Sequence, residues 1–92
     1  MKKSKSISLQ DTAKKIIPGL TQLLSKRPDM FSTDIWPGYF SKSKGCQVWD
    51  LDGNEYLDMS ISGIGANILG YAVDEVDDKV INSIRSGVSS SL

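Results

Sequence analysis

The chain has 92 residues, of which 39% are hydrophobic and 24% charged, and its charges cancel to a net value of zero. This composition is typical of a globular protein, and a neutral chain has no general attraction to nucleic acid or an acidic membrane, so we expect neither as a partner. Histidine is absent, which removes the commonest general base and metal ligand. The single cysteine, Cys46, excludes an internal disulfide, and we expect it to be buried in a reducing, cytoplasmic setting.

The length suits one small domain or part of a larger one. A chain of this size buries only about 60–65% of the surface that its unfolded form exposes, so a deep active site is difficult to build. No run approaches the ~18 apolar residues of a membrane span, and the basic start is not followed by the apolar segment of a signal peptide. Residues 1–45 carry a charge of +6 and residues 46–92 a charge of −6, so the halves attract each other or belong to a larger surface.

Residues 1–7 are polar, and we expect a flexible amino terminus followed by an incomplete domain over residues 8–92. Ser8, with Asp11 three residues later, resembles a capping box and predicts the start of a helix. Pro18 and Gly19 would end it. The apolar residues recur at helical spacing and predict one buried face, formed by Leu9, Ala13, Ile16, Ile17 and Leu20.

The rest of the pattern predicts a loop, a small sheet and a second helix. Residues 21–37 have no clean period and predict an extended loop. Residues 39–44, 46–50 and 55–59 predict strands, with a hairpin turn at Asp52 and Gly53. Asp74 is expected to cap a helix that ends at Ser86 and Gly87. The fold class is therefore α+β: an amino-terminal helix, an antiparallel sheet of two or three strands, and a second helix.

Three aspartates, Asp50, Asp52 and Asp58, surround the hairpin turn. A calcium loop that starts at Asp50 would need glycine at its sixth position and glutamate at its twelfth, but glycine falls at the fourth and Ile61 at the twelfth. The alternative is that Asp52 favours the turn while the other two face solvent or cap neighbouring loops. We therefore interpret the cluster as structural.

The glycine-rich stretch SISGIGANILGY, residues 60–71, matches no phosphate-binding motif. A dinucleotide pattern that opens at Gly63 would need a third glycine where Ile68 stands, and the phosphate-loop spacing of Gly65 and Gly70 is not followed by lysine and a hydroxyl residue. The glycines let the backbone approach either a ligand or, as we favour, another piece of protein. Lys26 and Arg27 could clamp an anion such as a carboxylate, or be a solvated pair. No catalytic site is complete within the chain.

The order of these parts resembles the amino terminus of class III aminotransferases, which are pyridoxal-phosphate (PLP) enzymes of fold type I, and most closely the glutamate-1-semialdehyde aminomutase group. The shared features are IIPGLTQLLSKRP, the tract GYFSKSKGCQVWDLDGNEYLDMS, and a glycine-rich stretch that ends in ILGY before a helix. The family tract Gly-x-x-Val-x-Asp-x-Asp-Gly-x-x-Tyr-x-Asp is matched by Gly45, Val48, Asp50, Asp52, Gly53, Tyr56 and Asp58. Two features depart from the family: its Leu-Gly-His is Leu69-Gly70-Tyr71 here, and the stretch from Asp58 to Gly70 is about one residue longer.

The resemblance implies that this is an amino-terminal fragment, inactive by itself, of a homodimeric transaminase or aminomutase that acts on a small amino or keto compound with PLP. In the family, the cofactor-binding lysine and most cofactor contacts come from later sequence. The resemblance places Lys26 or Arg27 near the arginine that meets a substrate carboxylate. It places the other candidate binding residues along the pocket wall, namely Ser62, Gly63, Ile64 and Gly65. The alternative is a small α+β interaction module, or a relic, without catalysis.

Overall fold

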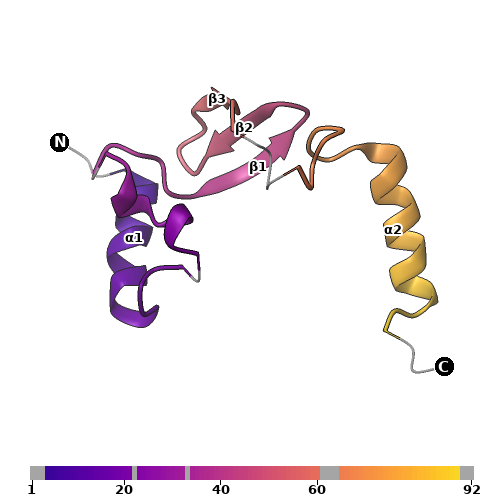
Figure 1. Cartoon of the computed structure of the whole chain (residues 1–92), viewed down its shortest axis with the longest axis horizontal. Coiled ribbons are helices and arrows are strands. Elements are labelled where there is room, and N and C mark those ends of the chain that lie inside the picture. Colours follow the sequence, from indigo (N-terminus) through magenta and orange to yellow (C-terminus); the bar gives the residue numbers. More distant parts are fainter. Residues whose placement is uncertain (1–3, 22, 33, 61–64, 90–92) are drawn as a thin grey trace. The chain divides into compact units, whose positions relative to one another are not determined.

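The computed structural model describes residues 4–21, 23–32, 34–60 and 65–89. The predicted α+β class is confirmed: two helices accompany a three-stranded antiparallel sheet in the order β1-β2-β3 (Figure 1). The elements are α1 (Lys5–Ile16), the short 3-10 helices η1 (Leu24–Lys26) and η2 (Pro28–Met30), β1 (Phe40–Lys44), β2 (Gln47–Asp50), β3 (Glu55–Leu57) and α2 (Asp74–Ser86). In the described part of the chain, neither helix has the length and apolar character needed to cross a membrane. The chain divides into two compact units, residues 1–42 with 48–56, and residues 43–47 with 57–92.

In the first unit, α1 begins four residues before the predicted cap. The Ser4 side chain accepts a hydrogen bond from the Ile7 N–H at 3.2 Å, so Ser4 is the cap, and the prediction of Ser8 is wrong. Residues 5–7, which we expected to be flexible, are helical. The Lys5 N–H also donates to the Asp52 carboxylate at 3.0 Å. A free donor of the first helical turn therefore has a partner on the hairpin, which favours the earlier start.

The face that α1 buries also differs from the predicted apolar one. The buried residues are Ser6, Gln10 and Ala13, whereas Leu9 and Ile16 are 41% and 71% exposed. The segment before β1 passes close to this face: a Cβ added at Gly38 would lie 2.9 Å from the Pro28 side chain and 3.7 Å from the Gln10 Oε1. Among the residues described, the buried apolar side chains are those of Ala13 and Pro28.

The described residues of the predicted loop, namely 21, 23–32 and 34–37, are irregular as expected, apart from η1 and η2. Within this loop the rings of Phe31 and Trp36 stack with centroids 4.4 Å apart. The β2–β3 turn closes at the predicted place, where Gly53 has φ of +85°. Cys46 lies in the turn between β1 and β2 and is exposed, so the expectation of a buried thiol is wrong. A turn position presents its side chain to solvent even when strands flank it.

In the second unit, α2 ends where the sequence predicted. Gly87 has φ of +101°, and its N–H donates to the Ile84 carbonyl at 3.1 Å. Glycine adopts this conformation without a steric penalty, which explains the stop. The apolar side chains of α2 are between 44% and 57% exposed, namely Val76, Val80, Ile81 and Ile84.

Candidate functional site

Lys26 and Arg27, the predicted carboxylate-binding pair, belong to the first unit. Lys26 is exposed at the end of η1. The Arg27 Nη2 donates to the Asp29 carboxylate at 2.9 Å, and the two side chains are 34% and 40% exposed. The Arg27 Nε is buried without a hydrogen-bond partner. The guanidinium therefore already holds one carboxylate of the chain itself, in a partly solvated pair of the kind that contributes little to stability.

The predicted pocket-wall residues are described only at Gly65, because Ser62, Gly63 and Ile64 lie outside the described residues. Gly65 belongs to the second unit, is exposed, and has φ of +80° with nothing within 4 Å of an added Cβ. A positive φ is the conformation that glycine allows and other residues resist. The prediction that Lys26, Arg27 and Gly65 contact a substrate stays a prediction.

A small hollow lies beside Gly65, between the segment that follows it and the first turn of α2. Its volume is about 190 Å³. Complete ligand pockets usually measure about 300–1,000 Å³, so this hollow is at most part of a wall. It is lined by Ala66, Asn67, Ile68, Leu69, Gly70, Ala72, Val73, Val76 and Asp77.

The backbone of the glycine-rich segment is attached to the β1–β2 turn. The Gly45 N–H donates to the Tyr71 carbonyl at 2.9 Å, and the Tyr71 N–H donates to the Gly45 carbonyl at 2.8 Å. Gly70 has φ of +92°, and an added Cβ would lie 3.1 Å from the Gly45 oxygen and 3.2 Å from its Cα. For Gly70, therefore, the partner that the backbone approaches is protein, as we favoured.

The same attachment includes a side-chain contact that the sequence analysis missed. The Tyr71 hydroxyl donates to the Asp58 carboxylate. Asp58 is held in turn, because its N–H donates to the Cys46 carbonyl at 2.7 Å and its carboxylate accepts from the Ser60 N–H at 2.8 Å. The interpretation that Asp58 caps a neighbouring loop is confirmed. The signal in the sequence was tyrosine in place of the histidine of the related tract.

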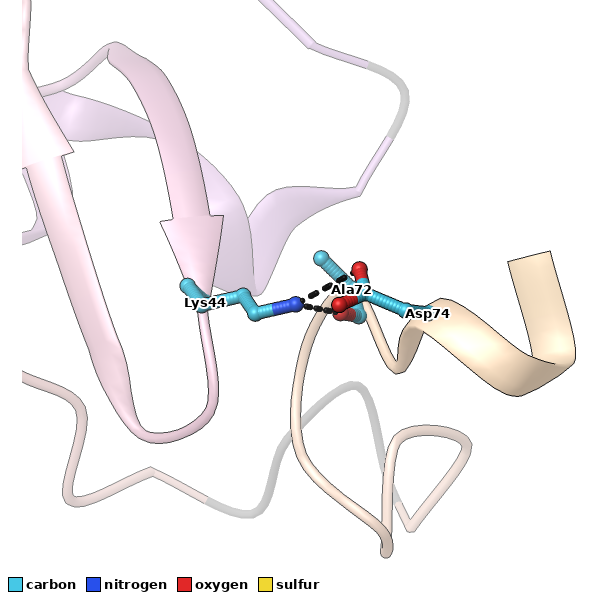
Figure 2. A network of polar contacts seen from close by, with 3 residues as sticks. All are labelled: Lys44, Ala72 and Asp74. Carbon is cyan, nitrogen blue, oxygen red and sulfur yellow. Dashed lines mark hydrogen bonds and ion pairs between the residues drawn. The ribbon is translucent and has the colours of Figure 1, made fainter. Parts of the chain in front are cut away.

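Lys44, at the end of β1, reaches the segment before α2 (Figure 2). Its Nζ donates to the Ala72 carbonyl at 2.5 Å and pairs with the Asp74 carboxylate at 2.8 Å. The expectation that Asp74 caps α2 is wrong: Val73 occupies the cap position, and no side chain caps the helix. The Asp74 side chain pairs with Lys44, and as the first helical residue it still places negative charge at the positive end of the helix dipole.

Asp50 organises the hairpin of the first unit. Only 6% exposed, it accepts from the backbone N–H groups of Asp52 and Asn54 at 2.9 and 2.8 Å, and from the Asn54 amide and Tyr56 hydroxyl at 2.9 and 3.0 Å. Burial alone would raise the pKa of Asp50, but these hydrogen bonds outweigh it and lower the pKa below the usual 3.8. Burial and the nearby Asp50 raise the pKa of Tyr56. The interpretation of the aspartates as structural holds for Asp50, although its carboxylate does not face solvent.

The first turn of α2 does not fit the phosphate of a cofactor, and the described residues form no cluster that could hold a metal ion. A helix N-terminus attracts phosphate through its free N–H groups, but the first turn of α2 carries Asp74, Glu75 and Asp77. Their charges oppose a second anion. Within the described ranges, no three acidic or cysteine side chains gather as metal ligands do.

Comparison with known proteins identifies relatives over nearly the whole chain, although no protein-family model matches it. It is 41% identical over 86 residues to 3-aminobutyryl-CoA aminotransferase of Cloacimonas acidaminovorans, a match that covers 94% of this chain and 20% of the relative. It is 38% identical over 92 residues to glutamate-1-semialdehyde 2,1-aminomutase of Caldicellulosiruptor saccharolyticus, covering all of this chain and 20% of that enzyme.

Solved structures agree with these matches. An ω-transaminase from Sphaerobacter thermophilus aligns with a TM-score of 0.79 and 26% identity, over 97% of this chain and 19% of that one. The FumI protein of Sphingopyxis sp., in its PLP internal aldimine form, aligns with a TM-score of 0.81 over 95% of this chain and 20% of that one. At 23% identity, the second match speaks for the fold alone.

The fold is thus that of a segment of the transaminases. The resemblance to the amino-terminal part of class III aminotransferases and aminomutases is confirmed, and this chain is a relative of that family. It spans about a fifth of the length of the curated relatives that it matches.

Proposed function

We propose that this chain is the amino-terminal part of a PLP-dependent class III aminotransferase or aminomutase, whose complete form transfers an amino group on a small amino or keto compound. The observation that carries the proposal is the similarity to two such enzymes over 94% and 100% of the chain. Because the chain corresponds to a fifth of those enzymes, the remaining sequence would supply the cofactor lysine and the cofactor-phosphate site. The acidic first turn of α2 supports this division, since it opposes a phosphate.

The roles proposed for this chain lie in substrate binding. Arg27 offers the guanidinium fork that matches a carboxylate, with Lys26 beside it as a second cation. Ser62, Gly63, Ile64 and Gly65 would border the pocket, where missing side chains let a substrate approach the backbone. When bound, PLP supplies the electron sink that amino-group chemistry requires. The substrates in the names of these relatives, aminobutyryl-CoA and glutamate-1-semialdehyde, indicate the chemical class of substrate.

The exposure of apolar side chains supports an incomplete domain, inactive by itself. Among the described residues only the small apolar side chains of Ala13 and Pro28 are buried, whereas large apolar side chains such as Ile35, Met59 and Ile68 are more than 80% exposed. Exposed apolar surface of this kind usually has a protein partner. We propose that the rest of the same polypeptide and a second subunit cover it, in a cytoplasmic homodimer.

The alternative is an independent interaction module, favoured by the half-exposed apolar side chains of α2. It requires a chain that folds alone. Cooperative thermal unfolding of a monomer would support this alternative, whereas a molten or aggregating chain would support the incomplete domain.

The first experiment is to sequence the coding DNA beyond the Leu92 codon. The proposal expects an open frame about five times the length of the matched segment, with a lysine after a strand and an acidic residue upstream. A stop codon directly after Leu92 would withdraw the enzymatic claim for this product. The second experiment compares the 92-residue chain with the complete product, both loaded with PLP. Only the complete product should show a visible cofactor–lysine absorbance and transfer amino groups; turnover by the short chain would contradict its proposed inactivity.

A further inference from the structure

We propose that Tyr71 is a positioning residue, which holds the segment from Gly65 to Gly70 on the β1–β2 turn and thereby keeps the pocket wall at Gly65 in place. This inference rests on the proposed function, because it concerns a wall of the same substrate site. Its residues all belong to the second unit.

The backbone of Tyr71 supplies the first part of the attachment. Its N–H and carbonyl form a reciprocal pair of hydrogen bonds with Gly45, 2.8 and 2.9 Å long. The Gly70 Cα faces the Gly45 backbone so closely that a methyl group there would lie 3.1 Å from the Gly45 oxygen. The carboxyl end of the glycine-rich segment is therefore fixed against the turn.

The Tyr71 side chain supplies the second part. Its hydroxyl donates to the Asp58 carboxylate, and Asp58 follows β3 directly. Hydrogen bonds to a charged acceptor are the stronger class. Asp58 is itself bonded to the Cys46 carbonyl through its N–H. Tyr71 therefore contacts the turn at Gly45 through its backbone and the residue after β3 through its hydroxyl.

Lys44 holds the chain on the other side of Tyr71. Its ammonium group binds the Ala72 carbonyl and the Asp74 carboxylate (Figure 2). Ala72 has φ of +52°, a conformation that costs free energy for a residue other than glycine and persists where surrounding contacts impose it. The contacts of Lys44 and Tyr71 therefore converge on the short connection between the glycine-rich segment and α2.

Tyrosine suits this role because a phenol donates a hydrogen bond as a neutral group, whereas an imidazole gains a positive charge below its usual pKa of about 6.5. The charged groups on the elements that meet here are Lys44 of β1, Asp58 after β3 and Asp74 of α2. A histidine at position 71 would gain charge beside the Asp58 carboxylate as the pH falls. Its attachment would then strengthen as the pH falls through the imidazole pKa.

The first test uses hydrogen exchange of the Gly45 and Tyr71 amides in the complete protein, with rates corrected for intrinsic pH dependence. Tyr71→Phe should accelerate both by about tenfold, the usual scale for one lost hydrogen bond to a charged acceptor. Tyr71→His should give more protection at pH 5.5 than at pH 8, because the neutral imidazole still donates one N–H but loses the charge that strengthens the bond. Tyr39→Phe, which removes a phenol from the first unit, is the matched control and should change neither rate. Equal rates in Tyr71→Phe and the control, or unprotected amides in the parent chain, would overturn the proposal.

The second test measures steady-state kinetics of the complete enzyme. Tyr71→Phe should raise KM by roughly three- to tenfold and change kcat by less than about twofold, because a displaced wall weakens substrate binding more than the chemical step. Tyr71→His should show that rise in KM at pH 8 and less of it at pH 5.5. A fall in kcat alone would overturn the positioning role. A parent enzyme without transaminase or aminomutase activity would refute the proposed function. The exchange measurement would still test whether Tyr71 holds the segment on the β1–β2 turn.

Discussion

Replacement of Asp50 by alanine is expected to open the β2–β3 turn. The carboxylate accepts hydrogen bonds from two backbone N–H groups, a side-chain amide and a phenol, at distances from 2.8 to 3.0 Å. Alanine offers none of them an acceptor. Because Asp50 is only 6% exposed, water cannot simply take the place of the carboxylate in the intact turn.

The magnitude follows from which donors lose a partner. These donors belong to Asp52, Asn54 and Tyr56, which are exposed. Water can therefore hydrogen-bond to some of the donors that lose the carboxylate. The free energy of opening the turn should therefore fall by much less than the sum of four charged hydrogen bonds, and we expect a decrease of about 2–3 kcal/mol. Asp50→Asn should cost less, about 1 kcal/mol, because its carbonyl oxygen can keep the two backbone donors while its NH₂ group opposes the other two.

The assay is hydrogen exchange of the Asp52 and Asn54 amides, which are themselves the donors. A loss of 2–3 kcal/mol corresponds to exchange about 30- to 140-fold faster in Asp50→Ala. Asp34→Asn, at an exposed aspartate with φ of +63° that asparagine tolerates, is the control for removal of one negative charge. Exchange within about twofold of the parent in Asp50→Ala, with β1 and α2 still formed, would refute the reasoning.

Two further predictions concern pH and glycine. The lowered pKa of Asp50 means that its contribution to stability is fully present above the usual value of 3.8 and is lost as the pH falls through the folded-state pKa. NMR shifts of the Asn54 amides should be flat from pH 7 to about 5 and change below about pH 4. The same titration in Asp50→Asn would contradict this assignment. Gly70→Ala and Gly65→Ala share the penalty of positive φ, but only the former meets the Gly45 backbone; exchange at the Gly45 amide should accelerate more in Gly70→Ala, and equal effects would show that the close approach is not decisive.

Much of the fold follows from local signals. Asp52 and Gly53 between strand-forming runs predict the hairpin, because both residues tolerate the conformation that a tight turn needs. Gly87 ends α2 for the same reason at a helix terminus. The resemblance also required only the sequence, since it rests on the order and spacing of short motifs. These features involve contacts within a few residues along the chain.

The errors occur where a residue distant in sequence decided the outcome. The capping-box pattern predicted Ser8 as the cap, but Ser4 caps α1, and the Asp52 carboxylate accepts from the Lys5 N–H, 47 positions away in sequence. Asp74 has the chemistry of a cap, yet Lys44, 30 positions earlier, pairs with its side chain. Cys46 lies between two strand-forming runs but occupies a turn.

For the candidate site, the sequence by itself determined which residue types are present and which family tract contains them. Only the tertiary structure showed that Arg27 already holds Asp29, that Gly70 faces the Gly45 backbone, and that Tyr71 reaches Asp58. The physical reason is that propensity and periodicity report the preferences of a residue for its own backbone conformation. The partner of a carboxylate, a phenol or a bare glycine depends instead on which distant segment the folded chain brings within hydrogen-bond or van der Waals distance.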